Sequence, residues 1–411
     1  MNVKTKNLFF PLYCILFSQG LFAQLPVRES LFTDVFTIDP EKEGQLGLCI
    51  DNISFLNDLE TGGDIQKGYT LPGFRFNPRL TYYPTSMIKL ELGVSLLRFW
   101  GADKYPNFAY RNISEWKAPG YQIGFHLLPF FRAQVQPVPE LNIVLGHIYG
   151  GNNHGLIEPL YNSELNYTAD PEMGAQIIYN SRVARFDTWV NWETFTFKDE
   201  ANNEVLTAGA SGRFHITNPQ SFFYLGIPIQ AVITHHGGEI NSIEGNTISL
   251  ANGAAGLQCG FNFDNPVFKN LSLSLMGVGY KDLHSEESLL FDKGWAAYSN
   301  LNIQVWNLNL KMNIWRSGNF INLFGSPIFG NVSTSKENWN FPRITVLNPG
   351  IKYEQEFGNG CHLGVNFELF FAPEFTMYDG VVPIKTDKYF GCSMGLFLRI
   401  NPSIVLSKQK L

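Results

Sequence analysis

The chain has 411 residues and a formal net charge of −6, and 16% of its residues are charged while 15% are aromatic. Soluble domains carry about 25% charged residues, so this composition is unusual for a soluble protein. A mildly acidic chain without a basic tract is also a poor nucleic-acid binder, so we expect no nucleic-acid partner. After the N-terminal segment no apolar run reaches the roughly eighteen residues that a membrane-spanning helix needs. Low charge, many aromatic residues and 38 glycines without helical spans indicate instead a β-barrel in a membrane.

The first element in chain order is a targeting segment. Residues 1–23 have the anatomy of a secretory signal peptide, because two lysines precede an apolar run over 8–17 and small residues follow it. We expect cleavage after Ala23. Residues 24–44 are then expected to form a short N-terminal arm in the periplasm or a segment in the lumen. Residues 45–411 are expected to form a single outer-membrane barrel.

Beyond this arm, apolar and polar residues alternate, which is the pattern of a half-buried strand. In residues 88–96, for example, isoleucine, leucine and valine alternate with lysine, glutamate, glycine and serine, and the pattern recurs in 362–369. At Trp306 the apolar positions change from odd to even numbers, as a tight turn between two strands with one common exterior face requires. Sixteen candidate strands follow, at residues 45–56, 74–83, 87–100, 120–135, 140–149, 173–181, 183–196, 204–216, 221–235, 247–263, 270–281, 294–305, 308–317, 345–357, 361–372 and 388–404.

The connections between these strands alternate in length. The short ones are residues 84–86, 136–139, 182, 217–220, 264–269, 306–307 and 358–360. The longer ones are residues 57–73, 101–119, 150–172, 197–203, 236–246, 282–293, 318–344 and 373–387. Because lipid cannot satisfy free backbone groups, such a sheet must close on itself. We therefore predict an all-β fold, a closed transmembrane antiparallel β-barrel of about sixteen strands with short periplasmic turns and long external loops.

With its signal peptide ending in Ala23-Gln24, its repeated amphipathic strands and its long external loops, the chain resembles porin-type outer-membrane proteins of Gram-negative bacteria, especially those of Bacteroidota. The resemblance covers the whole mature chain, but it is a resemblance of architecture. No family-specific motif in the sequence identifies a substrate. It implies a location in the outer membrane, with the lipid bilayer and lipopolysaccharide as partners. Association with further copies of the chain or with other envelope proteins is left open.

Charged residues at lumen-facing positions are the candidate pore wall. On the lipid face each arginine or lysine near the midplane would cost about 2–4 kcal/mol, so these side chains must face water or one another. The candidate pore-lining residues are Arg75, Arg79, Lys89, Glu91, Arg132, Arg185, Asp187, Glu193, Arg213, His215 and Glu368. They are interpreted either as cationic and anionic zones that orient polar solutes or as structural ion pairs.

The connection 150–172 is the candidate constriction loop. It contains apolar residues that need burial, and it carries two acids, Glu158 and Glu164. A loop of this kind can fold into a barrel and narrow it. The longer connection 318–344 is its rival for this role, and an ordered external cap is the alternative for both.

Two further features of the sequence bear on metal binding and catalysis. His235, His236 and Glu239 offer zinc ligands. However, adjacent histidines on an extended chain point to opposite faces, so we predict no metal and no other cofactor. The chain contains no GxSxG motif and no other distinctive nucleophile context, and on that basis it is predicted not to be an enzyme.

The function predicted from the sequence is a porin-like outer-membrane channel for passive diffusion of small polar solutes. The alternative is a non-conducting barrel that serves as a subunit or anchor of an outer-membrane complex. A barrel-embedded enzyme is the third and least favoured hypothesis.

Overall fold

A computed structural model supplies the coordinates. It describes residues 32, 34, 36–100, 124–194, 204–237, 247–285, 289–336, 338–358 and 360–408. The predicted signal peptide, the predicted loop 101–119 and Glu239 lie outside these residues. Within them, no helix combines the length and the apolar character needed to cross a membrane.

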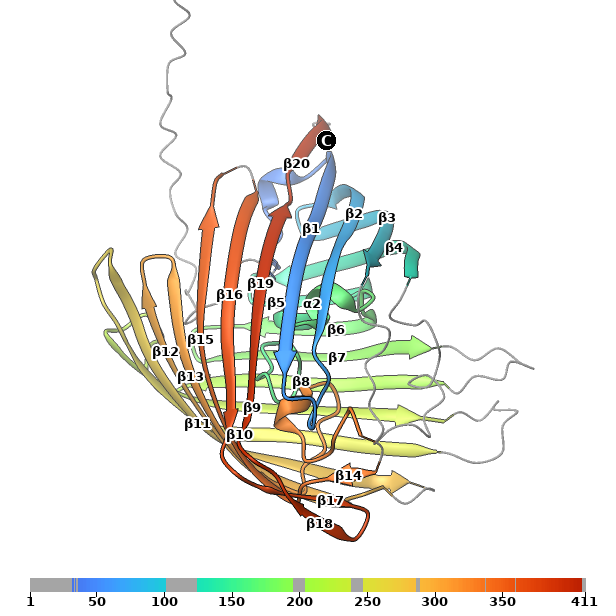
Figure 1. Cartoon of the computed structure of the whole chain (residues 1–411). Coiled ribbons are helices and arrows are strands. Elements are labelled where there is room, and N and C mark those ends of the chain that lie inside the picture. The colour runs from blue at the N-terminus through green and yellow to red at the C-terminus, as the bar shows by residue number, and fades with distance from the viewer. Residues whose placement is uncertain are drawn as a thin grey trace, which may run out of the picture.

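Antiparallel strands form a closed barrel (Figure 1), in which each strand is hydrogen-bonded to the next and β19 pairs back with β1. The sheet has 17 strands, but β20 continues β19 after a break at Pro402 and pairs with the same neighbour, so the wall has sixteen. The strands are β1 (Gln45–Thr61), β2 (Tyr69–Thr85), β3 (Ile88–Phe99), β4 (Gly124–Val138), β5 (Leu141–His147), β6 (Met173–Asn180), β7 (Ala184–Thr194), β8 (Val205–His215), β9 (Phe223–His236), β10 (Ile248–Asn262), β11 (Phe268–Ser285), β12 (Lys293–Val305), β13 (Leu308–Gly318), β15 (Arg343–Glu356), β16 (Cys361–Ala372), β19 (Tyr389–Ile400) and β20 (Ser403–Lys408).

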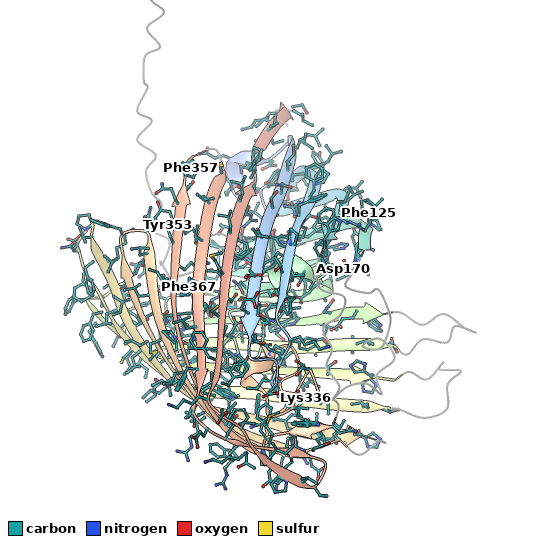
Figure 2. All side chains as sticks on the ribbon, viewed as in Figure 1. Phe125, Asp170, Lys336, Tyr353, Phe357 and Phe367 are labelled. Atoms are coloured by element: carbon teal, nitrogen blue, oxygen red, sulfur yellow. The ribbon has the colours of Figure 1, made fainter. Side chains whose placement is uncertain are left out.

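The alternation along each strand sorts side chains between the lumen and the exterior. In β3, Leu92 is 66% exposed whereas the adjacent Glu91 is 3% exposed. Apolar side chains such as Phe125 and Phe367 stand on the outer surface (Figure 2). The predicted fold is therefore confirmed: the molecule is a closed antiparallel β-barrel of sixteen strands.

The two-residue turn at Trp306 is also confirmed. Val305 pairs with Leu308, and Trp306 has the positive φ of 52° that such a turn uses.

The largest difference from the predicted strands is at the first hairpin. There β1 extends to Thr61 and β2 begins at Tyr69, so the connection is 62–68 and not 57–73. The outward residues Asp58 and Thr70 are polar although their backbones are paired. The hydrogen-bonded ladder thus continues past the level at which the exterior is apolar, and the alternation of hydrophobicity stops before the strands do.

Two external connections fold inward and join each other inside the barrel. Residues 150–172 contain η4 (Gly151–His154) and α2 (Leu165–Thr168), and residues 319–342 contain η5 (Pro327–Phe329). Tyr161 forms a parallel bridge with Phe324, and the Asn162 N–H donates to the Phe324 carbonyl at 2.8 Å. We call this pair of segments the plug.

The plug gives the barrel a packed core. The phenyl rings of Phe320, Phe329 and Phe341 are fully buried and cluster with Trp315 of β13. Past the external strand ends, β14 (Trp339–Asn340), β17 (Thr376–Asp379) and β18 (Val382–Lys385) form a small second sheet. The plug therefore fills the external half of the lumen, and its core is apolar.

The described part of the N-terminal arm also lies against the lumen wall. The Ile38 N–H donates to Gln136 Oε1 at 2.7 Å, and the Phe36 ring packs edge-on against Tyr149 at 4.9 Å. The arm contains one short helix, η2 (Pro40–Lys42), which is capped by Asp39.

Candidate functional site

Three of the predicted pore-lining residues, all cations, surround the buried carboxylate of a fourth. Glu91 contacts Arg79 Nε at 3.5 Å, Lys89 Nζ at 3.2 Å and Arg132 Nη1 at 3.0 Å. Arg132 is fixed further by the carbonyl of Ile148, to which its Nη2 donates at 3.1 Å. These charges therefore neutralise one another at the lumen wall.

A second cluster of charged residues lies in the lumen, and its members are not among the predicted pore-lining residues. Arg399 contacts Asp51 Oδ1 through Nε and Asp34 Oδ1 through Nη2, both at 2.9 Å. Asp51 lies on β1 and Asp34 belongs to the arm. Burial opposes the charged form of Asp34, but the nearby guanidinium of Arg399 outweighs it and holds the pKa of that carboxyl below its usual range. The predicted residue Arg75 faces the same lumen, and its Nε has no hydrogen-bond partner among the described residues.

Asp187 anchors the plug through a histidine that sequence reasoning missed. His154 contacts Asp187 Oδ2 through Nδ1 at 2.8 Å and Glu172 Oε2 through Nε2 at 3.0 Å, and its ring stacks on Trp189 at 3.5 Å. Burial opposes the charged imidazole, but the two carboxylates outweigh it and raise the pKa of His154 to about 9. Both ring nitrogens are committed, so His154 holds the loop and is not free to act as a base.

The two acids of the predicted constriction loop lie in the plug. Glu164 accepts hydrogen bonds at 3.0 Å from Asn57 Nδ2 and from the Tyr69 hydroxyl. Burial raises the pKa of Glu164 to about 8 despite these two bonds. Glu158 accepts from the Ser163 N–H at 3.1 Å.

Of the other predicted pore-lining residues, Glu368 pairs with Lys311 Nζ at 2.5 Å, and Glu193 accepts from the Thr207 hydroxyl at the external end. His215 faces the lumen at the periplasmic end of β8. Arg185 and Arg213 line a cavity together with Glu158 and Glu368. The roles of all these residues as a pore wall and a constriction stay predictions.

On the exterior, one polar pair has the composition of a catalytic dyad. His235 of β9 and Ser249 of β10 are direct cross-strand partners near the external ends of their strands, and His235 Nδ1 lies 2.8 Å from Ser249 Oγ. His236, the other histidine considered for zinc, points into the lumen and is buried. On the opposite side of Ser249, His284 of β11 is the cross-strand partner. We call His235 and Ser249 the rim dyad.

Cations and small residues lie next to the rim dyad on the outer surface. One step toward the periplasm, Ala251 pairs with Lys281, and Lys281 is directly opposite Lys293, with both lysines exposed. These two exposed ammonium groups form a small cationic patch that can pair with an anion. The next outward positions are Gly253 and Gly279.

A second outward polar pair lies on the opposite side of the barrel. The Thr70 hydroxyl of β2 donates to Asp58 Oδ1 of β1 at 2.5 Å, near the external end of both strands. Below it, the Arg98 guanidinium lies 5.1 Å from the centre of the Trp100 ring. This pair offers a carboxylate and a hydroxyl, but within the described residues it has no imidazole bonded to it.

The closed wall, the apolar exterior and the charged residues on the lumen side of the wall define an integral outer-membrane β-barrel protein with a porin-like fold. Among solved structures, OmpT of Vibrio cholerae is similar at 7% identity and a TM-score of 0.44, covering 86% of this chain and 99% of that one. An anion-selective porin from Comamonas acidovorans is similar at 10% identity and a TM-score of 0.45, covering 87% and 100%. OprD from Pseudomonas aeruginosa is similar at 10% identity and a TM-score of 0.44, covering 90% and 98%. No curated protein matches the chain.

The chain belongs to the lipid A 3′-O-deacylase-type family, whose model matches residues 38–409. The prediction that it is not an enzyme is therefore wrong, because the family is named for a hydrolytic reaction. That prediction relied on the absence of GxSxG, a motif of strand–turn–helix sites. A barrel wall brings together side chains from neighbouring strands, so a site on it leaves no short motif in the sequence.

Proposed function

We propose that this protein is an outer-membrane hydrolase that removes an ester-linked acyl chain from lipid A, and that the reaction takes place at the rim dyad. The observation that carries the proposal is the 2.8 Å contact between His235 Nδ1 and Ser249 Oγ on the outer surface. Family membership supplies the reaction class. The position of the dyad on the outer surface gives it access to the substrate, because the acyl esters of a membrane lipid lie where headgroups meet hydrocarbon.

The dyad provides the two groups that acyl transfer needs. His235 takes the proton of the Ser249 hydroxyl as its oxygen attacks the ester carbonyl carbon. Collapse of the tetrahedral intermediate breaks the bond to the sugar oxygen, which takes that proton from the imidazole. Water, activated by the same imidazole, then cleaves the acyl-serine. The products are the free fatty acid and the sugar hydroxyl, and no redox partner is required.

The surroundings of the dyad suit a phosphorylated lipid. Lys281 and Lys293 place two ammonium groups at the external end of the outer surface, where they can pair with the phosphates of lipid A. The small outward residues Gly253 and Gly279 leave room for an acyl chain against the sheet, next to the exposed ring of Trp295.

The plug bears on the alternative of a passive channel for small polar solutes. Its phenylalanine cluster and its hydrogen bonds to the wall fill the external half of the lumen. This packing supports a closed barrel whose chemistry takes place on its outer surface.

The test is the acylation state of lipid A from cells that make the protein, measured by mass spectrometry. The wild type should yield lipid A that lacks one acyl chain, and Ser249→Ala and His235→Ala should leave it intact. Thr70→Ala is the matched control, because it removes an outward hydroxyl at the same level. Loss of activity in Thr70→Ala with activity retained in Ser249→Ala would move the reaction to the Asp58–Thr70 pair. Intact lipid A with the wild type would refute the proposed function.

A further inference from the structure

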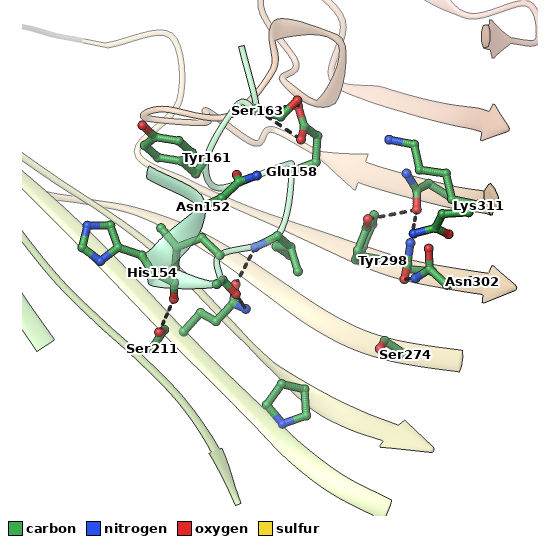
Figure 3. Close-up of a pocket in the computed structure, with 18 of the residues that line it drawn as sticks. Asn152, His154, Glu158, Tyr161, Ser163, Ser211, Ser274, Tyr298, Asn302 and Lys311 are labelled. Carbon is green, nitrogen blue, oxygen red and sulfur yellow. Dashed lines mark hydrogen bonds between the residues drawn. The ribbon is translucent and has the colours of Figure 1, made fainter. Parts of the chain in front are cut away.

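Below the plug, the lumen contains a cavity that the proposed reaction does not use. Its volume is about 330 Å³, and its walls include Arg185, Arg213, Gln258 and Lys311. Figure 3 shows the plug segment from Asn152 to Ser163 above it and the wall residues Asn302 and Lys311 beside it. These wall residues are only a few positions from the turn at Trp306, so the cavity occupies the periplasmic half of the barrel.

Two arginines stand side by side at this cavity. Arg185 of β7 and Arg213 of β8 are direct cross-strand partners. Arg185 donates to the Asn153 carbonyl at 3.0 Å, and neither arginine has a carboxylate within 4.0 Å among the described residues. The enclosed Nε of Arg213 has no hydrogen-bond partner in the part of the chain that the structure describes. Several other lumen cations are paired with a carboxylate, such as Lys311 with Glu368 and Arg132 with Glu91.

Two neighbouring arginines without an ion-pair partner are costly to enclose unless a ligand binds to them. Like charges directly opposite each other repel, and a guanidinium with an unused enclosed N–H loses hydrogen-bond energy. Two guanidinium groups at one wall form the donor set that binds phosphate or carboxylate oxygens. The pair therefore fits an anionic group inside the cavity.

The rest of the lining offers amide groups whose hydrogen-bonding capacity is not used by the protein. The side-chain oxygens of Gln258, Asn309 and Asn366 are enclosed and have no hydrogen-bond partner among the residues with described positions, and all three residues line the cavity. Amide oxygens accept hydrogen bonds from hydroxyl groups. Further asparagines line the same wall, including Asn300 and Asn302.

We propose that this cavity is a binding site for a phosphorylated saccharide that enters from the periplasm. Arg185 and Arg213 hold the phosphate, and the amide wall binds the sugar hydroxyls. The cavity volume suits a ligand of one sugar ring, at the small end of ligand pockets. The proposal is independent of the rim dyad, which lies on the outer surface.

The test is titration calorimetry on the detergent-solubilised full chain with glucose 1-phosphate as the probe. We expect saturable binding that weakens at least about tenfold in Arg213→Gln, because the charge-assisted bonds to phosphate are lost. Arg316→Gln removes an exposed arginine of β13 and should bind as the wild type does. Ser249→Ala should also bind normally, so a failed deacylase assay would not affect this result. Heat-modified migration on gels verifies that each variant is folded.

Three outcomes would overturn the proposal. One is no saturable binding of glucose 1-phosphate by the folded wild type. Another is equal binding by Arg213→Gln and the wild type. The third is inorganic phosphate binding as tightly as glucose 1-phosphate, which would mean a simple anion site without recognition of the sugar.

Discussion

Replacing Glu91 by alanine should destabilise the barrel strongly, because three cations share this carboxylate. Its oxygens lie 3.5 Å or less from Arg79, Lys89 and Arg132, and its side chain is 1% exposed. Removing one partner of a buried ion pair costs about 3–5 kcal/mol. Because Lys89 and Arg79 keep some access to water, we expect a loss of unfolding free energy at the lower end of this range, about 3 kcal/mol.

The assay is equilibrium unfolding in urea of the protein folded into lipid vesicles. Glu60→Ala is the matched control, because it removes an exposed outward carboxylate near the end of β1 and should change stability by less than about 0.5 kcal/mol. Adding Lys89→Met to Glu91→Gln should recover part of the loss, because one unpaired cation is removed with the carboxylate. A cost below about 1 kcal/mol for Glu91→Ala would refute the reasoning, since it would mean that water already solvates these cations.

Three further predictions concern the wall and the plug. Leu92→Arg should cost about 2–4 kcal/mol in lipid vesicles, because it places a charge in hydrocarbon, and an effect near zero would reverse the facing of β3. Glu164 has a pKa raised to about 8, so its contribution to stability is complete below its ordinary pKa of 4.5 and is lost as the pH rises through 8. Glu164→Gln should therefore unfold at a higher temperature than the wild type at about pH 9, but not at about pH 5. His154 has a pKa raised to about 9, so its contribution to stability is complete below its ordinary pKa of 6.5 and is lost as the pH rises through 9. In thermal melts, His154→Gln should therefore show a weaker dependence of stability on pH in this range than the wild type.

The strands could be predicted because lipid imposes a local rule. Every second residue must be apolar, so the facing of Glu91 and Leu92 can be read from the two residues themselves. The same rule does not predict whether the lumen is filled with water or with protein side chains. It identified Arg79, Lys89, Glu91 and Arg132 as lumen-facing, but not that they form one buried cluster.

The plug and the candidate site could not be predicted because both depend on contacts between distant segments. Tyr161 meets Phe324 only when two external loops fold inward together. His235 meets Ser249 only through the register of β9 and β10 across an intervening loop. The adjacent histidines His235 and His236 suggest a metal site in the sequence, whereas in the structure the partner of His235 is a serine on the next strand.

The most direct test of the account is the release of fatty acid from purified lipid A by the purified protein in detergent, measured by mass spectrometry. We predict that the wild type releases one ester-linked chain and that Ser249→Ala, while still folded, is slower by at least about 10³-fold. Undiminished release by Ser249→Ala would contradict the assignment of the rim dyad as the catalytic site.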